Sequence, residues 1–253
     1  MDEDNRVMLA VERSADAGGV ALFRGGRRLA VSPLEAVTAA PKDSGATASA
    51  RLAVIPEMLA LAHVAPADID RFVVGIGPGS FSGIRSAIAY LTGLAFPAGK
   101  TVEGYESPAV VATVLAARGL VRPAPEAPGQ STAKPNCVVV GDARRGTCWV
   151  AAFRVARSGD GGGTAVAATA PLSLVPYEGL AAALPPDAVV ATPDWKRLAD
   201  RLQACALGDR LVEGPALPTA EALAIRALCA AADAVPARPR YLHPAVAAPR
   251  QDV

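Results

Sequence analysis

Residues whose types could support chemistry are few in this 253-residue chain, and the first group lies near the N-terminus. The segment 12–19, Glu-Arg-Ser-Ala-Asp-Ala-Gly-Gly, joins two apolar runs and combines acidic side chains with a glycine pair. Gly18 and Gly19 could form a nest of backbone N–H groups that binds an anion. Glycine pairs are also common in hairpins, so a surface turn without a ligand is the favoured interpretation.

Histidine and cysteine give little support to metal binding or nucleophilic catalysis. The two histidines, His63 and His243, lie far apart in the chain, so we expect neither a histidine metal site nor a Ser-His-Asp arrangement. His63 ends an apolar helical pattern, where a partner of the helix dipole is commoner than a metal ligand. The four cysteines form no C-x-x-C pair, which predicts reduced, buried thiols in a cytoplasmic protein.

A second group is the string Gly-Pro-Gly-Ser-Phe-Ser-Gly-Ile-Arg, called here the signature loop (77–85), which joins a strand pattern to a helix pattern. Its glycines can adopt positive φ or admit another backbone, its proline fixes one φ, and either serine can cap the helix. The glycines alone favour a simple strand-to-helix turn, because glycine-rich loops have many uses. The candidate residues are Gly77, Pro78, Gly79, Ser80, Phe81, Ser82, Gly83 and Arg85.

The complete string is more specific than its glycines. It resembles the signature of the TsaB (YeaZ) family, Gly-Pro-Gly-Ser-Phe-Thr-Gly-Leu-Arg, and the following helix ends in Gly-Leu-Ala (93–95) as in that family. Ser82 and Ile84 depart from the pattern, although they keep a hydroxyl and a branched aliphatic side chain. TsaB is the partner-binding subunit of the bacterial machinery that adds threonylcarbamoyl to a tRNA adenosine, and the resemblance covers nearly the whole chain.

This resemblance implies a non-catalytic scaffold that binds TsaD and, through the complex, TsaE, so that the adenosine next to the tRNA anticodon becomes N6-threonylcarbamoyladenosine. It also implies a homodimer when TsaD is absent, indirect contact with tRNA, and no cofactor on this chain, with ATP and metal on the partner subunits. Two alternatives stay open. One is a stand-alone actin-fold ATPase or kinase, and the other is a protein-interaction module unrelated to tRNA.

The order of the predicted elements indicates an α/β fold built from two copies of one unit. The first copy comprises strands at 7–12, 19–24 and 27–32, a helix over 47–63 that Pro56 interrupts, a strand at 71–76 and a helix over 84–96. The second comprises strands at 137–142, 147–155 and 164–174, a helix over 177–184, a strand at 189–192 and a helix over 194–206. The shared order β-β-β-α-β-α is that of the duplicated, two-domain actin-like (ASKHA, ribonuclease H-like) folds, to which TsaB belongs.

The duplication also predicts domain boundaries. The helix over 107–118 should have Ser107 as its N-cap, and a late helix, capped by Thr219, should pack back on the first domain. The final Tyr-Leu-His (241–243) resembles the family's closing Tyr-Leu-Arg. The expected parts are a first domain over 1–105, a second over 106–215 with a proline-rich linker at 120–136, the returning helix within 219–234, and a tail over 235–253.

The resemblance gives two further groups a possible role. Related proteins usually carry Asp-Thr-Ser where this chain has Glu12, Arg13 and a serine, so nucleotide binding by this hairpin is in doubt. The catalytic sister family, TsaD, holds its metal with paired helical histidines, which this chain lacks. Asp142 and Arg144 resemble an Asp-Ala-Arg hairpin of the family. They either face an interdomain cleft and contact a partner or the tRNA backbone, or Asp142 accepts turn hydrogen bonds while the arginines are solvated.

The helix after the signature loop could contact another subunit. Its small residues would let a second helix approach closely, whereas its periodicity alone favours burial within its own domain. The resemblance reverses that preference, because TsaB proteins use this helix and the preceding one to pair with TsaD or with themselves. The predicted interface residues are Ile84, Ala87, Ile88, Ala89, Leu91, Thr92 and Gly93.

Composition excludes several classes of protein. The formal net charge of +1 creates no field that attracts a polyanion, so a partner should supply most contacts with tRNA. Residues 1–6 are acidic and polar, unlike a signal peptide, and no run approaches the ~20 apolar residues of a membrane span. We therefore expect a cytoplasmic protein that does not bind membranes.

Overall fold

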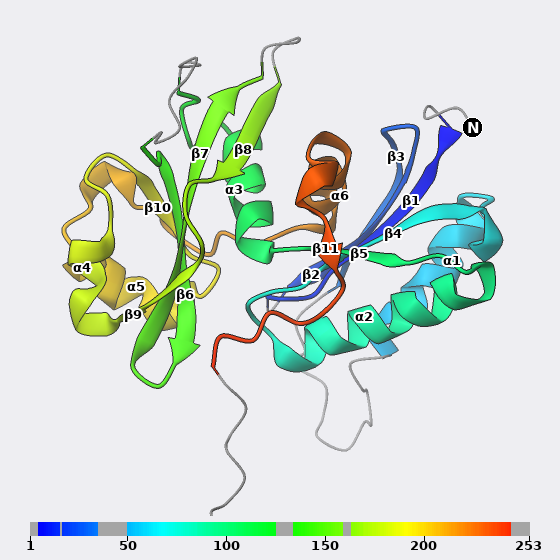
Figure 1. Ribbon diagram of the computed structural model, residues 1–253, viewed down its shortest axis with the longest axis horizontal. Coiled ribbons are helices and arrows are strands. Elements are labelled where there is room, and N and C mark those ends of the chain that lie inside the picture. Colours follow the sequence, from blue (N-terminus) through cyan, green and yellow to red (C-terminus); the bar gives the residue numbers. More distant parts are fainter. Residues whose placement is uncertain (1–4, 16, 35–49, 125–133, 159–162, 244–253) are drawn as a thin grey trace, which may run out of the picture.

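The structure is a computed structural model, and it describes residues 5–15, 17–34, 50–124, 134–158 and 163–243. Helices and sheets alternate across the molecule in the order α1 with α2, first sheet, α3 with α6, second sheet, and α4 with α5 (Figure 1). The helices are α1 (Val54–Leu61), α2 (Phe81–Ala95), α3 (Ser107–Ala117), α4 (Leu180–Ala183), α5 (Trp195–Ala204) and α6 (Ala220–Cys229). Short 3-10 turns occupy Ala50–Ala53, Pro66–Asp68, Phe96–Ala98, Tyr177–Gly179, Gly208–Arg210 and Ala231–Asp233.

The first sheet has six strands in the order β11-β5-β4-β1-β2-β3. They are β1 (Val7–Glu12), β2 (Gly18–Arg24), β3 (Arg27–Leu34), β4 (Ile69–Gly75), β5 (Val102–Tyr105) and β11 (Val235–Pro236). β1, β4 and β5 run parallel, whereas β2 and β3 follow β1 as antiparallel hairpins. Both faces are covered, since Leu9 packs toward α1 and α2 while its neighbour Ala10 packs toward α6. Because both faces of the sheet are buried, the sequences of its central strands are almost continuously apolar.

The second sheet has five strands, with the order β10-β6-β7-β8 and β9 also paired to β7. They are β6 (Cys137–Arg144), β7 (Thr147–Arg157), β8 (Thr164–Ala168), β9 (Ser173–Pro176) and β10 (Val189–Ala191). β10 and β6 are parallel. Trp149 and Phe153 face α3, whereas Cys148 and Val150 face α4 and α5.

The central layer of α3 and α6 joins the two sheets. α3 is apolar on nearly every side, because Val110 packs with α6 and the first sheet while Val111 packs with the second. The buried guanidinium of Arg226 on α6 donates to Val166 O of β8 at 3.1 Å and pairs with Asp233. A helix that packs on the first sheet therefore also hydrogen-bonds to the second.

The predicted β-β-β-α-β-α order is confirmed in both halves of the chain, with one strand divided. The single strand expected at 164–174 is wrong, because β8 and β9 pair with different halves of β7. Pro171 lies between them and has no N–H for a sheet ladder. Gly25 and Gly26 form the predicted hairpin turn, with φ of 53° and 74°.

Two helix starts also differ from prediction. α1 begins at Val54, so Pro56 falls in the first turn, where its missing N–H costs no hydrogen bond, and does not interrupt the helix. The N-cap of α3 is Glu106, because Ser107 already has a helical position and uses its hydroxyl elsewhere. Parts of the predicted helix (47–49), linker (125–133) and tail (244–253) lie outside the described residues.

Candidate functional site at the interdomain cleft

A cleft of about 470 Å³ lies where the carboxyl ends of parallel strands from both sheets meet. The segments after β1 and β4 line one side, and the end of β6 with the segment after β10 lines the other. Open α/β sheets place their ligand sites at such strand ends. The lining residues are Ser14, Ala15, Pro78, Gly79, Ser80, Phe81, Asp142, Ala143, Arg144, Asp194, Arg197, Arg240, Tyr241 and Leu242.

The signature loop holds the turn that follows β1. A Cβ atom added to Gly79 would lie 2.0 Å from Ser14 O, and one added to Gly83 would lie 2.3 Å from Arg13 O. The N–H of Ser80 donates to Ser14 O at 2.6 Å, which fixes the same contact. Both expectations for these glycines are therefore met: Gly77 has a positive φ of 90°, and another backbone approaches Gly79 and Gly83 closely. The loop therefore packs against the backbone of the first hairpin, and a turn with larger residues at positions 79 and 83 would clash with it.

Two serines connect this loop to its neighbours. Ser80 is the N-cap of α2, where its Oγ accepts the N–H of Gly83 at 3.3 Å, as the sequence predicts. Ser107 Oγ accepts the N–H of Gly77 at 3.1 Å and donates to Glu12 Oε2 at 3.1 Å. Strand β1, the loop and the start of α3 therefore share one hydrogen-bonded network.

Glu12 lies behind the first hairpin and points away from the cleft. Its carboxylate is fully buried, with Oε1 accepting the N–H of Ser14 at 2.7 Å. Gly75 makes room for it, because a Cβ there would lie 1.9 Å from Oε2. Burial raises the pKa of Glu12 above its ordinary value of 4.5, against the opposing effect of its hydrogen bonds. Arg13 is buried too, at 7% exposure, so neither long side chain lines the cleft.

Gly18 and Gly19 do not form an anion nest, which was the less favoured of the two interpretations. Both residues belong to β2 and neither has positive φ, whereas a nest needs alternating backbone conformations. Gly19 pairs with Glu12 on one side and Pro33 on the other. The acidic residue between them and β1, Asp16, lies outside the described residues.

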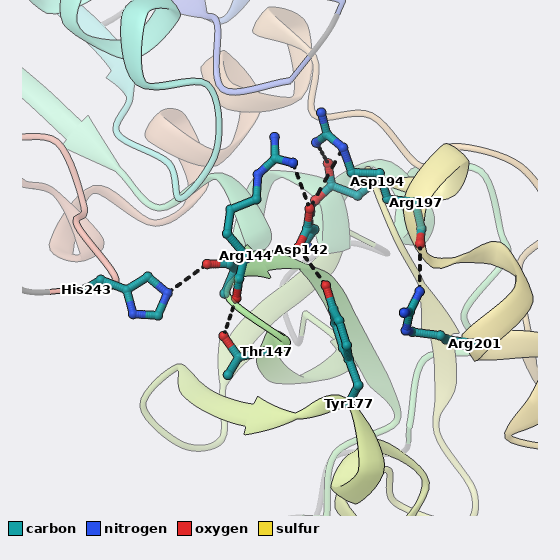
Figure 2. A network of polar contacts seen from close by, with 9 residues as sticks. Asp142, Arg144, Thr147, Tyr177, Asp194, Arg197, Arg201 and His243 are labelled. Atoms are coloured by element: carbon teal, nitrogen blue, oxygen red, sulfur yellow. Dashed lines mark hydrogen bonds and ion pairs between the residues drawn. The ribbon is translucent and has the colours of Figure 1, made fainter.

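Asp142 is the centre of the polar network on the opposite wall (Figure 2). Its side chain is 5% exposed, and Oδ1 accepts the N–H of Arg144 at 2.9 Å and the hydroxyl of Tyr177 at 3.0 Å. Oδ2 lies 3.3 Å from Arg144 Nη1 and 3.8 Å from Arg197 Nε. The backbone N–H of Asp142 donates to Asp194 Oδ2 at 2.8 Å. Asp142 thus accepts local turn hydrogen bonds and also lines the cleft, while its contact with a partner or tRNA stays a prediction.

Tight backbone geometry holds the turn between β6 and β7. Arg144, Arg145 and Gly146 all have positive φ, at 66°, 52° and 76°. The middle and last of these form a two-residue hairpin loop, and the register shifts just before it. Thr147 Oγ1 donates to Arg144 O at 2.8 Å, which ties the two strands at the loop (Figure 2). The Arg144 side chain, 64% exposed, is therefore carried on a fixed backbone.

The tail after β11 forms a third side of the cleft. The N–H of Arg240 donates to Ile76 O at 2.9 Å, beside the signature loop, and its Nε lies 3.4 Å from Glu106 Oε1. Farther along, a ring nitrogen of His243 lies 2.7 Å from Ala143 O near the end of β6 (Figure 2). The tail therefore contacts both domains.

An aromatic pair lies where the tail meets the signature loop. The rings of Phe81 and Tyr241 are 5.8 Å apart between centroids, and the Arg85 guanidinium lies 4.9 Å from the Phe81 centroid. The two aromatic residues are 56% and 59% exposed, respectively. Large apolar rings are thus presented to solvent beside the arginines of the cleft.

A family model covers this region of the chain. The family described as "TsaD: tRNA N6-adenosine threonylcarbamoyltransferase" matches residues 40–185, more than half of the sequence. The chain belongs to this family. No curated protein sequence matches the chain significantly.

Two solved structures are similar to this TsaD-family chain over nearly its whole length. YeaZ from Pseudomonas aeruginosa is 24% identical, with a TM-score of 0.69 over 94% of this chain and 100% of that one. A second protein, described as similar to the peptidase YeaZ from Pseudomonas aeruginosa, is 22% identical, with a TM-score of 0.68 and the same coverage. The predicted resemblance to YeaZ is confirmed, and with it the duplicated actin-like α/β fold.

The metal site that TsaD builds from paired histidines does not fit the residues of this family member. His63 is exposed with φ of 51° after the end of α1, whereas His243 contacts Ala143 near the end of β6. The described residues include no cluster of His, Cys, Asp or Glu that could hold a metal ion. Within that same part of the chain, no helix is long and apolar enough to span a bilayer.

The cysteines offer no activated nucleophile in the cleft. Burial raises the pKa of Cys137 to about 12 and that of Cys148 to about 11, which keeps both thiols protonated at neutral pH. The expectation that all four are buried is wrong for Cys205, which is half-buried, and for Cys229, which is exposed.

The helix predicted to contact a partner, α2, divides into an inner and an outer face. Ile84, Ala87 and Leu91 are buried in their own domain, which corrects their place in the predicted interface, because buried side chains cannot contact another subunit. Ile88 is partly buried against the same core. The outer face presents Ala89, Thr92 and Gly93 to solvent.

Several site residues are missed by the sequence argument. Asp194 and Arg197 follow β10, and their closeness to Asp142 depends on the parallel pairing of β10 with β6. The sequence could have predicted the position of Asp194 and Arg197, because polar residues that follow parallel strands converge at one edge of the sheet. Arg240 and the exposed ring of Tyr241 had no such signal, since the path of the tail is set by tertiary contacts.

Proposed function

We propose that this chain is a non-catalytic subunit of the TsaB kind, which binds a catalytic TsaD subunit in a cytoplasmic complex that makes N6-threonylcarbamoyladenosine in tRNA. TsaE would join through that complex. The family description supports the tRNA reaction, and the signature loop and the YeaZ-like fold support the TsaB role.

The observation that carries this proposal is the outer face of α2. A Cβ added at Gly93 would meet no heavy atom within 4 Å, and Ala89 and Thr92 are also exposed. On the same side of the first sheet, Leu61 and Phe96 are 83% and 81% exposed. Small residues permit close helix contact, and the two large apolar side chains at the helix ends lose water when a partner covers them. A second copy of the chain would occupy this face when TsaD is absent.

The burial of Glu12 supports a non-catalytic role. An actin-like ATPase needs an acidic side chain that reaches its bound nucleotide from the first hairpin. Here Glu12 is buried, and both of its oxygens accept hydrogen bonds from Ser14 and Ser107. Turning it toward the cleft would break both bonds. The stand-alone ATPase or kinase alternative is therefore disfavoured, and in calorimetric titrations ATP should bind no more tightly when Mg²⁺ is added.

The test is a charge placed on the outer face. Ala89→Arg puts a guanidinium into a desolvated contact, where an unpaired charge costs roughly 2–5 kcal/mol. Light scattering should show loss of the homodimer, and pull-down with TsaD should fail, while circular dichroism stays native. Gly93→Arg is a second variant of the same face. Ala204→Arg, at an exposed position of α5, is the matched control and should bind normally.

Two outcomes contradict the proposal. If both α2 variants bind TsaD like the control, the interface lies elsewhere. If both unfold the chain, the outer face is not a free surface, although its exposure predicts that an arginine is tolerated there.

A further inference from the structure

Three arginines from separate segments converge on the interdomain cleft. Arg144 comes from the end of β6, Arg197 from α5 and Arg240 from the tail, and all three line the cavity. Their side chains are 64%, 47% and 45% exposed. Two aspartates line the same cavity, so the arginines outnumber the lining carboxylates by one.

Carboxylates that are less exposed than the arginines hold these guanidinium groups in place. Asp142, at 5% exposure, lies 3.3 Å from Arg144 and 3.8 Å from Arg197. Arg197 is also 3.6 Å from Asp194, and Glu106 is 3.4 Å from Arg240. A guanidinium has five N–H donors and each carboxylate engages at most two of them, so Arg197, which faces two carboxylates, keeps at least one donor, and Arg144 and Arg240 keep at least three. The remaining N–H groups are held in a fixed orientation and can donate to a ligand, and this arrangement recognises a phosphate.

The aromatic pair gives the same cleft a second binding chemistry. Phe81 and Tyr241 both line it and are more than half exposed. Exposed rings beside arginines are the common means of binding unpaired nucleotides, because every base has a face that can stack on a ring.

We infer that this cleft binds an unpaired nucleotide of an RNA chain, with the flanking phosphates on the arginines and the base against the aromatic pair. A cavity of about 470 Å³ is in the range of ~300–1,000 Å³ that encloses one small organic group, so a duplex does not enter. The inference rests on the proposed function in one respect, since that function makes tRNA the RNA that the complex encounters. It replaces the expectation of purely indirect contact with tRNA.

The test measures RNA binding by the full chain. A fluorescently labelled single-stranded RNA is titrated by anisotropy, with a blunt RNA duplex and free AMP as competitors. The single strand should bind, the duplex should not compete, and AMP should compete weakly because it has one phosphate. Arg197→Ala and Tyr241→Ala should each weaken binding about tenfold. Arg197→Ala should also reduce the slope of log affinity against log salt by ~0.7.

Controls separate stacking, charge and partner binding. Tyr241→Phe keeps the ring and should bind normally, and Arg27→Ala, at the exposed start of β3 outside the cleft, should not change affinity. Equal binding of duplex and single strand, AMP binding as tight as RNA, or normal binding by Arg197→Ala and Tyr241→Ala would each overturn the inference. Ala89→Arg should lose TsaD yet keep RNA binding, so failure of this inference and failure of the proposed function give different results.

Discussion

Two glycines of the same helix provide a matched test of how the signature loop works. Gly83 and Gly93 both lie in α2, and replacing either by alanine gains about 1 kcal/mol of helix propensity. At Gly93 the added Cβ meets no heavy atom within 4 Å. At Gly83 it would lie 2.3 Å from Arg13 O, a backbone atom of the hairpin held by the loop. The two substitutions should therefore have opposite signs.

The magnitudes follow from these distances. Gly93→Ala should stabilise the chain by about 1 kcal/mol, which raises Tm by about 2–4 °C for a chain of this size. Gly83→Ala must displace a backbone carbonyl, and overpacking of this kind costs about 1–3 kcal/mol. After the propensity gain, the net change is a loss of up to about 2 kcal/mol and a lower Tm. The difference in Tm between Gly93→Ala and Gly83→Ala is therefore the quantity to measure.

The assay is thermal unfolding followed by circular dichroism, at a concentration where light scattering shows the monomer. That condition matters because Gly93 lies on the proposed interface, and dimerisation would raise Tm by mass action. If Gly83→Ala melts at or above Gly93→Ala, the loop does not hold the hairpin, and the physical explanation of the signature is wrong.

Two further predictions concern residues next to the segments that line the cleft. Because burial raises the pKa of Glu12, its contribution to stability is complete below its unfolded pKa of about 4.5 and falls as pH rises toward the raised value. Glu12→Gln should flatten this fall in urea melts run from below pH 4.5 upward, and an unchanged pH profile would argue against a buried carboxylate. Arg145 has φ of 52°, which asparagine tolerates better, so Arg145→Asn should stabilise the hairpin by up to about 1 kcal/mol. A lower Tm would contradict that account of the turn.

Local chemistry made part of the fold predictable. Gly25 and Gly26 specify a two-residue hairpin, and Ser80 caps α2 because its position before the helix leaves no better acceptor for the N–H of Gly83. The alternation of strands and helices then indicates two copies of one unit. Predictions failed where one residue could play either of two roles. Ser107 could cap α3, but its hydroxyl instead forms hydrogen bonds with Glu12 and Gly77.

The cleft itself was not predictable from local patterns. Asp142 and Arg197 are near each other only because β10 pairs beside β6, and sheet order is set by tertiary packing. The direction of Glu12 depends on the space left by Gly75, a residue on a different strand. Helical periodicity places Ile84, Ala87 and Leu91 on one face of α2, which the structure buries, but periodicity could not say whether its own domain or a partner covers that face.

The most direct measurement of the central claim is tRNA modification by reconstituted components. The chain alone, TsaD with TsaE, and all three together are incubated with unmodified tRNA and threonylcarbamoyl-adenylate, and N6-threonylcarbamoyladenosine is quantified by mass spectrometry. A non-catalytic partner-binding subunit predicts no product from the chain alone and a large increase when it joins TsaD and TsaE. Product formed by the chain alone, or full activity of TsaD and TsaE without it, would contradict the account.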